Sequence, residues 1–259
     1  SCQSDPAKLA ALANSFDQIR YKILSAPSQM LVVGEQDVVV DALSFLQTTK
    51  FGSGTDNDMA AFMVPRDLAK SNCAWLTNTQ VNFCAKAYLA VTEGHADAPA
   101  LAVLAKYLQD GYLHPAIREK GGAYGAGAQF DTESATFRFF SYRDPRLSAT
   151  LEDFDRSLVW LEQAAEADRL EESILGVIRN LDSPRSPAGS AVHSFYEELD
   201  GRTHQFRLAY REAVLNTTFD DLRRVADRYL KPDTAAIAVI THAAHQQELE
   251  KLHLKGVKL

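Results

Sequence analysis

Arg118 and Tyr124 carry side chains that could act on a carbonyl group, and a short glycine-containing segment separates them. An arginine guanidinium presents a planar fork of N–H donors to a carbonyl or a carboxylate. A tyrosine hydroxyl can donate a hydrogen bond to the oxyanion that forms when a carbonyl carbon is attacked. Each also has a structural interpretation, as a cation at a helix end and as a half-buried aromatic. Residue type alone favours the structural interpretation. Both residues are nevertheless kept as candidates for a functional role.

A glycine pair lies between these two side chains. Gly121 and Gly122 predict the end of a helix, because glycine enters the left-handed conformation without a Cβ penalty. The glycine pattern over 121–127 is not a dinucleotide fingerprint, which needs a strand before it and a helix after it. The glycines either permit a tight helix-to-strand turn or let a peptide strand approach an exposed edge. On the second interpretation the substrate-binding candidates are Gly121, Gly122 and Ala123.

A helix and a hairpin must position these residues. Pro115 fits the first turn of a short helix that ends at the glycines, since that turn leaves its N–H groups unpaired in any case. The chain then becomes extended and forms a predicted hairpin with its turn at 131–134. Hydrophobic periodicity predicts the other elements. The expected strands are 30–33, 81–91, 123–130, 135–142 and 235–240, and the expected helices are 6–24, 37–46, 98–110, 147–165, 168–181, 190–213, 219–230 and 244–253.

The sequence contains one internal repeat. Phe16-Asp17-Gln18-Ile19-Arg20 resembles Phe219-Asp220-Asp221-Leu222-Arg223, and each segment opens a helix–strand–helix series. A repeat at this separation suggests duplicated domains, although two short segments can also agree by chance. On the duplication hypothesis, residues 1–48 are the closing tail of one domain, 49–72 are a linker, and 73–259 are a complete second domain.

A zinc site is not predicted. A catalytic zinc usually needs three protein ligands, often with two histidines four residues apart on one helix face. None of the seven histidines has that spacing, and neither His-Glu-x-x-His nor His-x-x-Glu-His occurs. There is no Gly-x-Ser-x-Gly elbow for a serine nucleophile. The three cysteines, Cys2, Cys73 and Cys84, have neither disulfide-framework nor thiolate-site spacing.

Composition excludes several classes of function. The chain has 259 residues, of which 46% are hydrophobic and 24% charged, values ordinary for a globular protein. Its formal net charge of −7 argues against nucleic-acid binding, which needs a basic surface. No apolar run approaches the roughly 20 residues of a membrane-spanning helix, so no membrane partner is expected. There is no initial methionine and no signal peptide, and we therefore expect a piece of a longer chain.

Two segments carry a resemblance to a known family. The run Arg118-Glu119-Lys120-Gly121-Gly122-Ala123-Tyr124-Gly125 resembles the signature of the last of four homologous domains in pitrilysin/insulysin zinc metallopeptidases. Phe140-Ser141-Tyr142-Arg143-Asp144-Pro145, directly after the hairpin, is similar to the presequence-protease branch. The resemblance covers nearly the whole chain, as the end of a third domain, a linker and a fourth domain.

The resemblance implies a fold and a set of roles. The fold is α+β, a metallopeptidase-type domain like those of LuxS and the mitochondrial processing peptidase, with an antiparallel-rich sheet covered on one face by helices. This agrees with the predicted element order. Zinc in the intact enzyme would be bound by the first domain, on an inverted His-x-x-Glu-His motif that this chain lacks. The last domain would contribute an arginine and a tyrosine to the substrate backbone, which by motif position are Arg118 and Tyr124.

The expected function is that of the C-terminal, substrate-binding part of a zinc metalloendopeptidase that degrades unstructured peptides. This chain would bind no metal and be inactive alone, and its partners would be the peptide and the N-terminal half of the same polypeptide. Two alternatives stay open: a non-catalytic scaffold or partner subunit of the family, and an unrelated α+β peptide-binding module. The sparse cysteines and the acidic charge favour the bacterial cytoplasm over the alternative, an organellar matrix.

Overall fold

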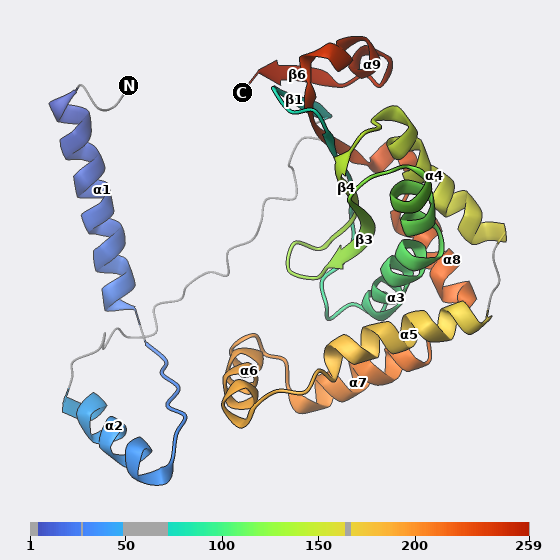
Figure 1. Cartoon of the computed structure of the whole chain (residues 1–259). Coiled ribbons are helices and arrows are strands. Elements are labelled where there is room, and N and C mark those ends of the chain that lie inside the picture. Colours follow the sequence, from blue (N-terminus) through green and yellow to red (C-terminus); the bar gives the residue numbers. More distant parts are fainter. Residues whose placement is uncertain (1–4, 27, 49–71, 164–166, 259) are drawn as a thin grey trace. The chain divides into compact units, whose positions relative to one another are not determined.

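The computed structural model describes residues 5–26, 28–48, 72–163 and 167–258 (Figure 1). The chain forms two compact units, one made of 1–63 with 184–203 and the other of 64–183 with 204–259. The expected linker, 49–72, lies outside the described residues apart from Asn72. No helix in the described ranges is long and apolar enough to cross a membrane.

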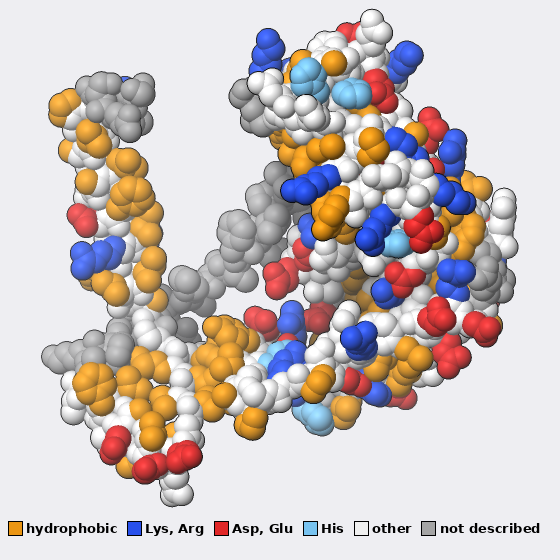
Figure 2. All heavy atoms as spheres, in the orientation of Figure 1, with side chains coloured by type: hydrophobic (Ala, Val, Ile, Leu, Met, Phe, Trp, Pro, Cys, Tyr) orange, Lys and Arg blue, Asp and Glu red, His pale blue; other side chains and the backbone are white. Residues whose placement is uncertain are grey.

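The described part of the first unit contains the helices α1 (Pro6–Ser25), α2 (Gln36–Thr48) and α6 (Pro187–Leu199). The side chain of Asp5 caps α1 by accepting from the N–H groups of its first turn. None of the residues of α1 or α2 is buried, and Figure 2 shows hydrophobic side chains along both helices. The exposed apolar residues of α1 include Leu9, Leu12, Phe16, Ile19 and Ile23.

One predicted strand is not formed in this unit. Residues 30–33 were expected to be a strand, but in the structure they belong to no sheet. A strand needs a neighbour to pair its backbone N–H and C=O groups, and none of the described strands pairs with this segment. Residues 30–33 therefore have the apolar pattern of a strand, but no described strand pairs with them.

The second unit is built on a six-stranded sheet with the order β3-β4-β2-β5-β1-β6. Three pairings, β3–β4, β4–β2 and β2–β5, are antiparallel, and β5–β1 and β1–β6 are parallel. The predicted α+β class with an antiparallel-rich sheet is thus confirmed. The two strands that the sequence did not predict, β1 and β6, are short. The strands are β1 (Cys73–Thr77), β2 (Asn82–Leu89), β3 (Gly125–Asp131), β4 (Thr136–Asp144), β5 (Ala236–His242) and β6 (Lys255–Lys258).

Helices cover one face of this sheet (Figure 1). The helix predicted over 190–213 is wrong as a single element, because it is interrupted at Gly201, whose φ of 72° ends a helix. The helices of the second unit are α3 (Ala98–Leu108), η2 (Gln109–Lys120), α4 (Ser148–Gln163), α5 (Ala167–Leu181), α7 (His204–Leu215), α8 (Phe219–Tyr229) and α9 (Gln246–Lys251), with short 3₁₀ turns at Pro232–Thr234 and Ala243–His245.

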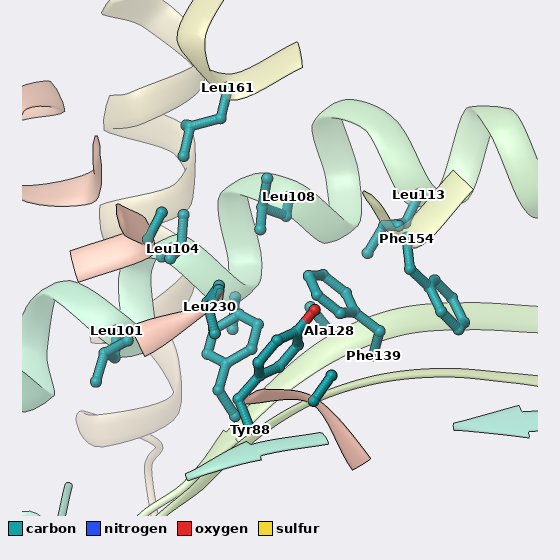
Figure 3. Close-up of a cluster of buried hydrophobic side chains, with 14 of the residues drawn as sticks. Tyr88, Leu101, Leu104, Leu108, Leu113, Ala128, Phe139, Phe154, Leu161 and Leu230 are labelled. Carbon is teal, nitrogen blue, oxygen red and sulfur yellow. The ribbon is translucent and has the colours of Figure 1, made fainter. Parts of the chain in front are cut away.

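Buried and exposed side chains alternate along β4, which shows which face of the sheet is toward the core. Phe137 and Phe139 are fully buried, whereas Arg138 between them is exposed, as expected for a strand with one covered face. The ring of Phe139 stacks on Phe154 of α4 with centroids 5.5 Å apart, and Tyr88 of β2 meets its edge at 6.1 Å. Figure 3 shows these rings beside the leucines of α3. Sheet and helices therefore share one continuous core.

A buried carboxylate fastens α8 to the start of α3. Asp97 accepts hydrogen bonds from Arg224, from Arg228 (3.1 Å) and from the Tyr229 hydroxyl (2.7 Å). Burial alone would raise the pKa of Asp97, but the hydrogen bonds from Tyr229 and Arg224, with the guanidinium charge, outweigh it and lower the pKa. Because folding lowers its pKa, ionised Asp97 stabilises the fold at pH values above 3.8, the ordinary pKa of an aspartate. This stabilisation is lost as the pH falls through the lowered pKa.

Candidate substrate-contact site

The helix that carries Arg118 is longer than the sequence predicted. We expected Pro115 to begin a short helix, but α3 and η2 are continuous from Ala98 to Lys120 and Pro115 lies inside η2. The η2 segment is π-helical, with hydrogen bonds from residue i to i+5. Leu113 and Ile117 are the buried residues of η2. Tertiary packing therefore outweighs the local cost of an internal proline, and Arg118 sits at the end of a long helix anchored in the core.

The helix ends at a turn that uses its two glycines differently. Gly122 has a φ of 80°, the left-handed value expected of both glycines. Gly121 stays right-handed, with φ −81° and ψ −20°, which corrects that expectation. Gly121 is required for space instead, because a Cβ there would overlap the guanidinium of Arg146 and the carbonyl oxygen of Ile117. Arg146 is itself held by Asp153 of α4 at 3.1 Å, so the helix end rests on a fixed cation that complements its dipole.

Replacing Gly121 by alanine is expected to destabilise the second unit by about 1–3 kcal/mol, the usual cost of overpacking. The methyl group would meet a helical carbonyl that has little freedom to move. Urea unfolding followed by tryptophan fluorescence measures the change. Gly94→Ala is the matched control, because no heavy atom beyond its own chain neighbours lies within 4 Å of the position that its methyl group would take, and its midpoint should not fall. Equal midpoints for the two variants would contradict the close packing at Gly121.

The backbone donors of the turn are used within the turn. The N–H groups of Gly121 and Gly122 both donate to the carbonyl of Arg118, and that of Ala123 donates to Ile117 at 3.1 Å. Ala123 is also buried. The assignment of Gly121, Gly122 and Ala123 as substrate-binding residues stays a prediction. Their N–H groups are already engaged, and Arg146 fills the space beside Gly121, so such binding would involve their carbonyl oxygens.

Arg118 is exposed and is oriented by a neighbour that sequence reasoning missed. Its Nη1 lies 2.9 Å from Nε2 of His114, four residues earlier on the same helix. Because a guanidinium only donates, Nε2 of this histidine is the acceptor. The proton is then on Nδ1, which lies 3.3 Å from the Glu119 carboxylate. The four-residue spacing of His114 and Arg118 was the available signal, since such residues are neighbours on a helix.

Tyr124 lies just before β3 and is 63% exposed. Its N–H donates to the carbonyl of Arg143 at 3.3 Å, which closes the hairpin at this end. The ring lies against that of Tyr142, with centroids 5.4 Å apart. The guanidinium carbon of Arg143 lies 5.6 Å from the centroid of the Tyr124 ring, a cation–π arrangement. Neither Arg143 nor Tyr142 was a sequence candidate, because each becomes relevant only through the pairing of β4 with β3.

The structure thus places both predicted residues at one helix–hairpin junction. Arg118 precedes the Gly121–Gly122 turn and Tyr124 follows it, and both side chains are exposed. Among the described residues, no three His, Cys, Asp or Glu side chains are grouped so that they could hold a metal ion. Chemically, the junction presents two hydrogen-bond donors, a guanidinium suited to a carbonyl oxygen or carboxylate and a phenol suited to an oxyanion.

Residues 72–243 match the family described as the PreP C-terminal domain. The chain belongs to this family. Mitochondrial presequence protease of Drosophila melanogaster is 40% identical over 158 residues, which cover 60% of this chain and 15% of that protein. The presequence protease of Kluyveromyces lactis is 31% identical over 228 residues, 83% of this chain and 22% of that protein. This PreP-family chain therefore spans less than a quarter of the length of these relatives.

Solved structures share the fold at low sequence identity. A protease from Helicobacter pylori has a TM-score of 0.64 and 18% identity, covering 81% of this chain and 53% of its own. An M16 peptidase inactive domain from Pseudomonas fluorescens has a TM-score of 0.60 and 15% identity, with coverages of 82% and 52%. The family match and the presequence-protease relatives confirm the resemblance to the pitrilysin family and to its presequence-protease branch, and the alternative of an unrelated α+β module is wrong.

Proposed function

We propose that this chain is the C-terminal, substrate-contacting part of a zinc metalloendopeptidase that cleaves unstructured peptides. The observation that carries the proposal is the exposure of Arg118 and Tyr124 together at one rigidly supported helix–hairpin junction. The PreP family match supports the reaction class. The curated relatives are named mitochondrial presequence proteases, which favours an organellar matrix over our first expectation, the bacterial cytoplasm.

In this proposal the two residues contact different parts of the substrate backbone. The Arg118 guanidinium, steered by His114 at 2.9 Å, binds a peptide carbonyl next to the scissile bond and fixes its register. The Tyr124 hydroxyl donates to the scissile oxygen as it gains negative charge, which stabilises the transition state more than the ground state. Zinc, bound by the other half of the enzyme, supplies the activated water. In this proposal the metal ligands all belong to that other half.

The same proposal assigns residues 1–48, which are part of the first unit, to a neighbouring domain. Residues 1–48 are then the tail of a preceding homologous domain, in which 30–33 would gain the strand neighbour that the described strands do not provide. The repeat supports this: Leu222 of α8, which corresponds to Ile19, is fully buried. Phe16 and Ile19 of α1, in the repeated segment, are 62% and 52% exposed. An apolar helix face of this kind needs a partner layer, which the rest of the preceding domain would supply.

A reconstitution experiment tests the proposal. Cleavage of an internally quenched unstructured peptide is measured with this chain alone, with the separately produced N-terminal part of the polypeptide, and with their mixture in zinc buffer. We expect no turnover by either part and clear turnover by the mixture. The reconstituted activity should also be lost when residues 1–48 are deleted. A chelator added to the mixture is the control for adventitious protease.

The outcomes separate the candidate functions. Turnover by this chain alone, after the chelator control, would contradict the proposal, because it would require a complete active site here. A complex that forms but cleaves nothing favours the second candidate, a non-catalytic family scaffold. That candidate is supported by the likeness to an M16 peptidase inactive domain.

A further inference from the structure

The end of β4 contains a bulge centred on Arg143. Asp144 pairs with Asn82 of β2, and Ser141 pairs with Cys84, so β4 has two residues where β2 has one. A bulge of this kind bends the strand and turns its side chains in a new direction, and bulges occur often beside active sites. Tyr142, next to the bulge, pairs with Gly125 of β3, so the bulge lies beside the start of β3.

The backbone of Arg143 is left-handed. Its φ is 50°, a region in which a side chain is sterically unfavourable and which glycine or asparagine usually occupies. Strain at a non-glycine residue persists when the surrounding structure fixes it, and it is concentrated at functional sites. A glycine would form the same bulge at lower cost. The presence of an arginine therefore points to a use for its side chain.

That side chain meets Tyr124. The guanidinium carbon lies 5.6 Å from the centroid of the Tyr124 ring, and the carbonyl of the same arginine accepts the Tyr124 N–H at 3.3 Å. Tyr142 contacts the ring as well, at 5.4 Å, and it lies so close to Gly125 that a Cβ there would overlap its ring. Backbone, cation and aromatic ring thus all hold one exposed tyrosine.

We propose that Arg143 is a positioning residue that fixes the Tyr124 ring for its contact with the substrate, an inference that rests on the proposed function of Tyr124. An exposed tyrosine on a strand end exchanges between rotamers, which moves its hydroxyl by several ångströms. A donor aimed at a developing oxyanion must be held in place before the reaction. The guanidinium of Arg143 over the ring face selects one rotamer by cation–π attraction. Arg143 needs no contact with the substrate for this.

The test uses peptide cleavage by the reconstituted enzyme with Arg143→Asn. Asparagine tolerates the left-handed backbone, so the urea unfolding midpoint should be equal or higher. We expect kcat to fall about 3–5-fold, the value of one exposed cation–π contact, while KM stays within about twofold because substrate binding is not touched. Arg143→Lys, which retains the charge without the planar group, should give an intermediate kcat. If Arg143→Asn lowers the unfolding midpoint, Arg143→Gly makes the same comparison without backbone strain.

A double-mutant cycle with Tyr124→Phe distinguishes positioning from direct contact. In the Tyr124→Phe background Arg143→Asn should cause no further loss, since no hydroxyl remains to be oriented. An equal loss in both backgrounds would overturn positioning and assign Arg143 a contact of its own. Full activity of Arg143→Asn, with Tyr124→Phe impaired, would overturn the inference and leave the proposed function intact. Full activity of Tyr124→Phe itself would overturn both.

Discussion

Replacing Tyr124 by phenylalanine is expected to reduce kcat of the reconstituted enzyme by about 10²–10³-fold, as for other lost oxyanion donors. The substitution removes one oxygen atom and keeps the ring that packs against Tyr142, so folding should be unaffected. KM should change little, because the hydrogen bond is strongest in the transition state. The measurement is the steady-state kinetics of peptide cleavage, with far-ultraviolet circular dichroism to confirm the fold.

Tyr196→Phe is the matched control for this prediction. Tyr196 is 60% exposed, lies on α6 of the first unit, and loses the same hydroxyl on substitution. Its kinetics should equal those of the unaltered protein. A loss shared by both tyrosine variants would indicate a general effect of the substitution. If Tyr124→Phe raised KM with kcat unchanged, the hydroxyl would act in ground-state binding, and the assignment to the oxyanion would be wrong.

Replacing Phe139 by alanine is expected to lower the free energy of unfolding of the second unit by about 3–5 kcal/mol. The ring is fully buried and contacts Tyr88, Phe137 and Phe154. Its loss removes apolar contact area from the centre of the core and leaves a cavity between sheet and α4. Urea unfolding can be followed by tryptophan fluorescence, because both tryptophans, Trp75 and Trp160, lie in the second unit.

Phe140→Ala supplies the control for the core substitution. Phe140 follows Phe139 on β4 but is only partly buried, since successive side chains point to opposite faces of the sheet. We expect it to cost less than about 1.5 kcal/mol, in keeping with its smaller burial. Equal costs for the two phenylalanines would mean that the helices do not cover one face only, contrary to the structure.

Local rules account for much of the site. The glycine pair ends the helix where predicted, and the alternation of β2 and the two strands of the hairpin were recovered to within a few residues. These features depend on near neighbours, through glycine conformation and the two-residue period of a strand. The family signature then gave roles to Arg118 and Tyr124. Fold class and family could therefore be predicted from the order of the residues, and the roles of Arg118 and Tyr124 stay predictions.

How that site is held depends on contacts between distant segments. Packing against the sheet explains why the helix continues through Pro115, and β1 is a strand because β5 and β6 pair with it. The bulge that brings Arg143 over Tyr124 depends on the register between β4 and its neighbours. Residues 30–33 have a strand pattern and yet no described strand pairs with them. These four features have one physical reason. Hydrogen bonds and contacts between distant segments decide whether each feature forms, and periodicity along the chain does not indicate which distant segment will be the partner.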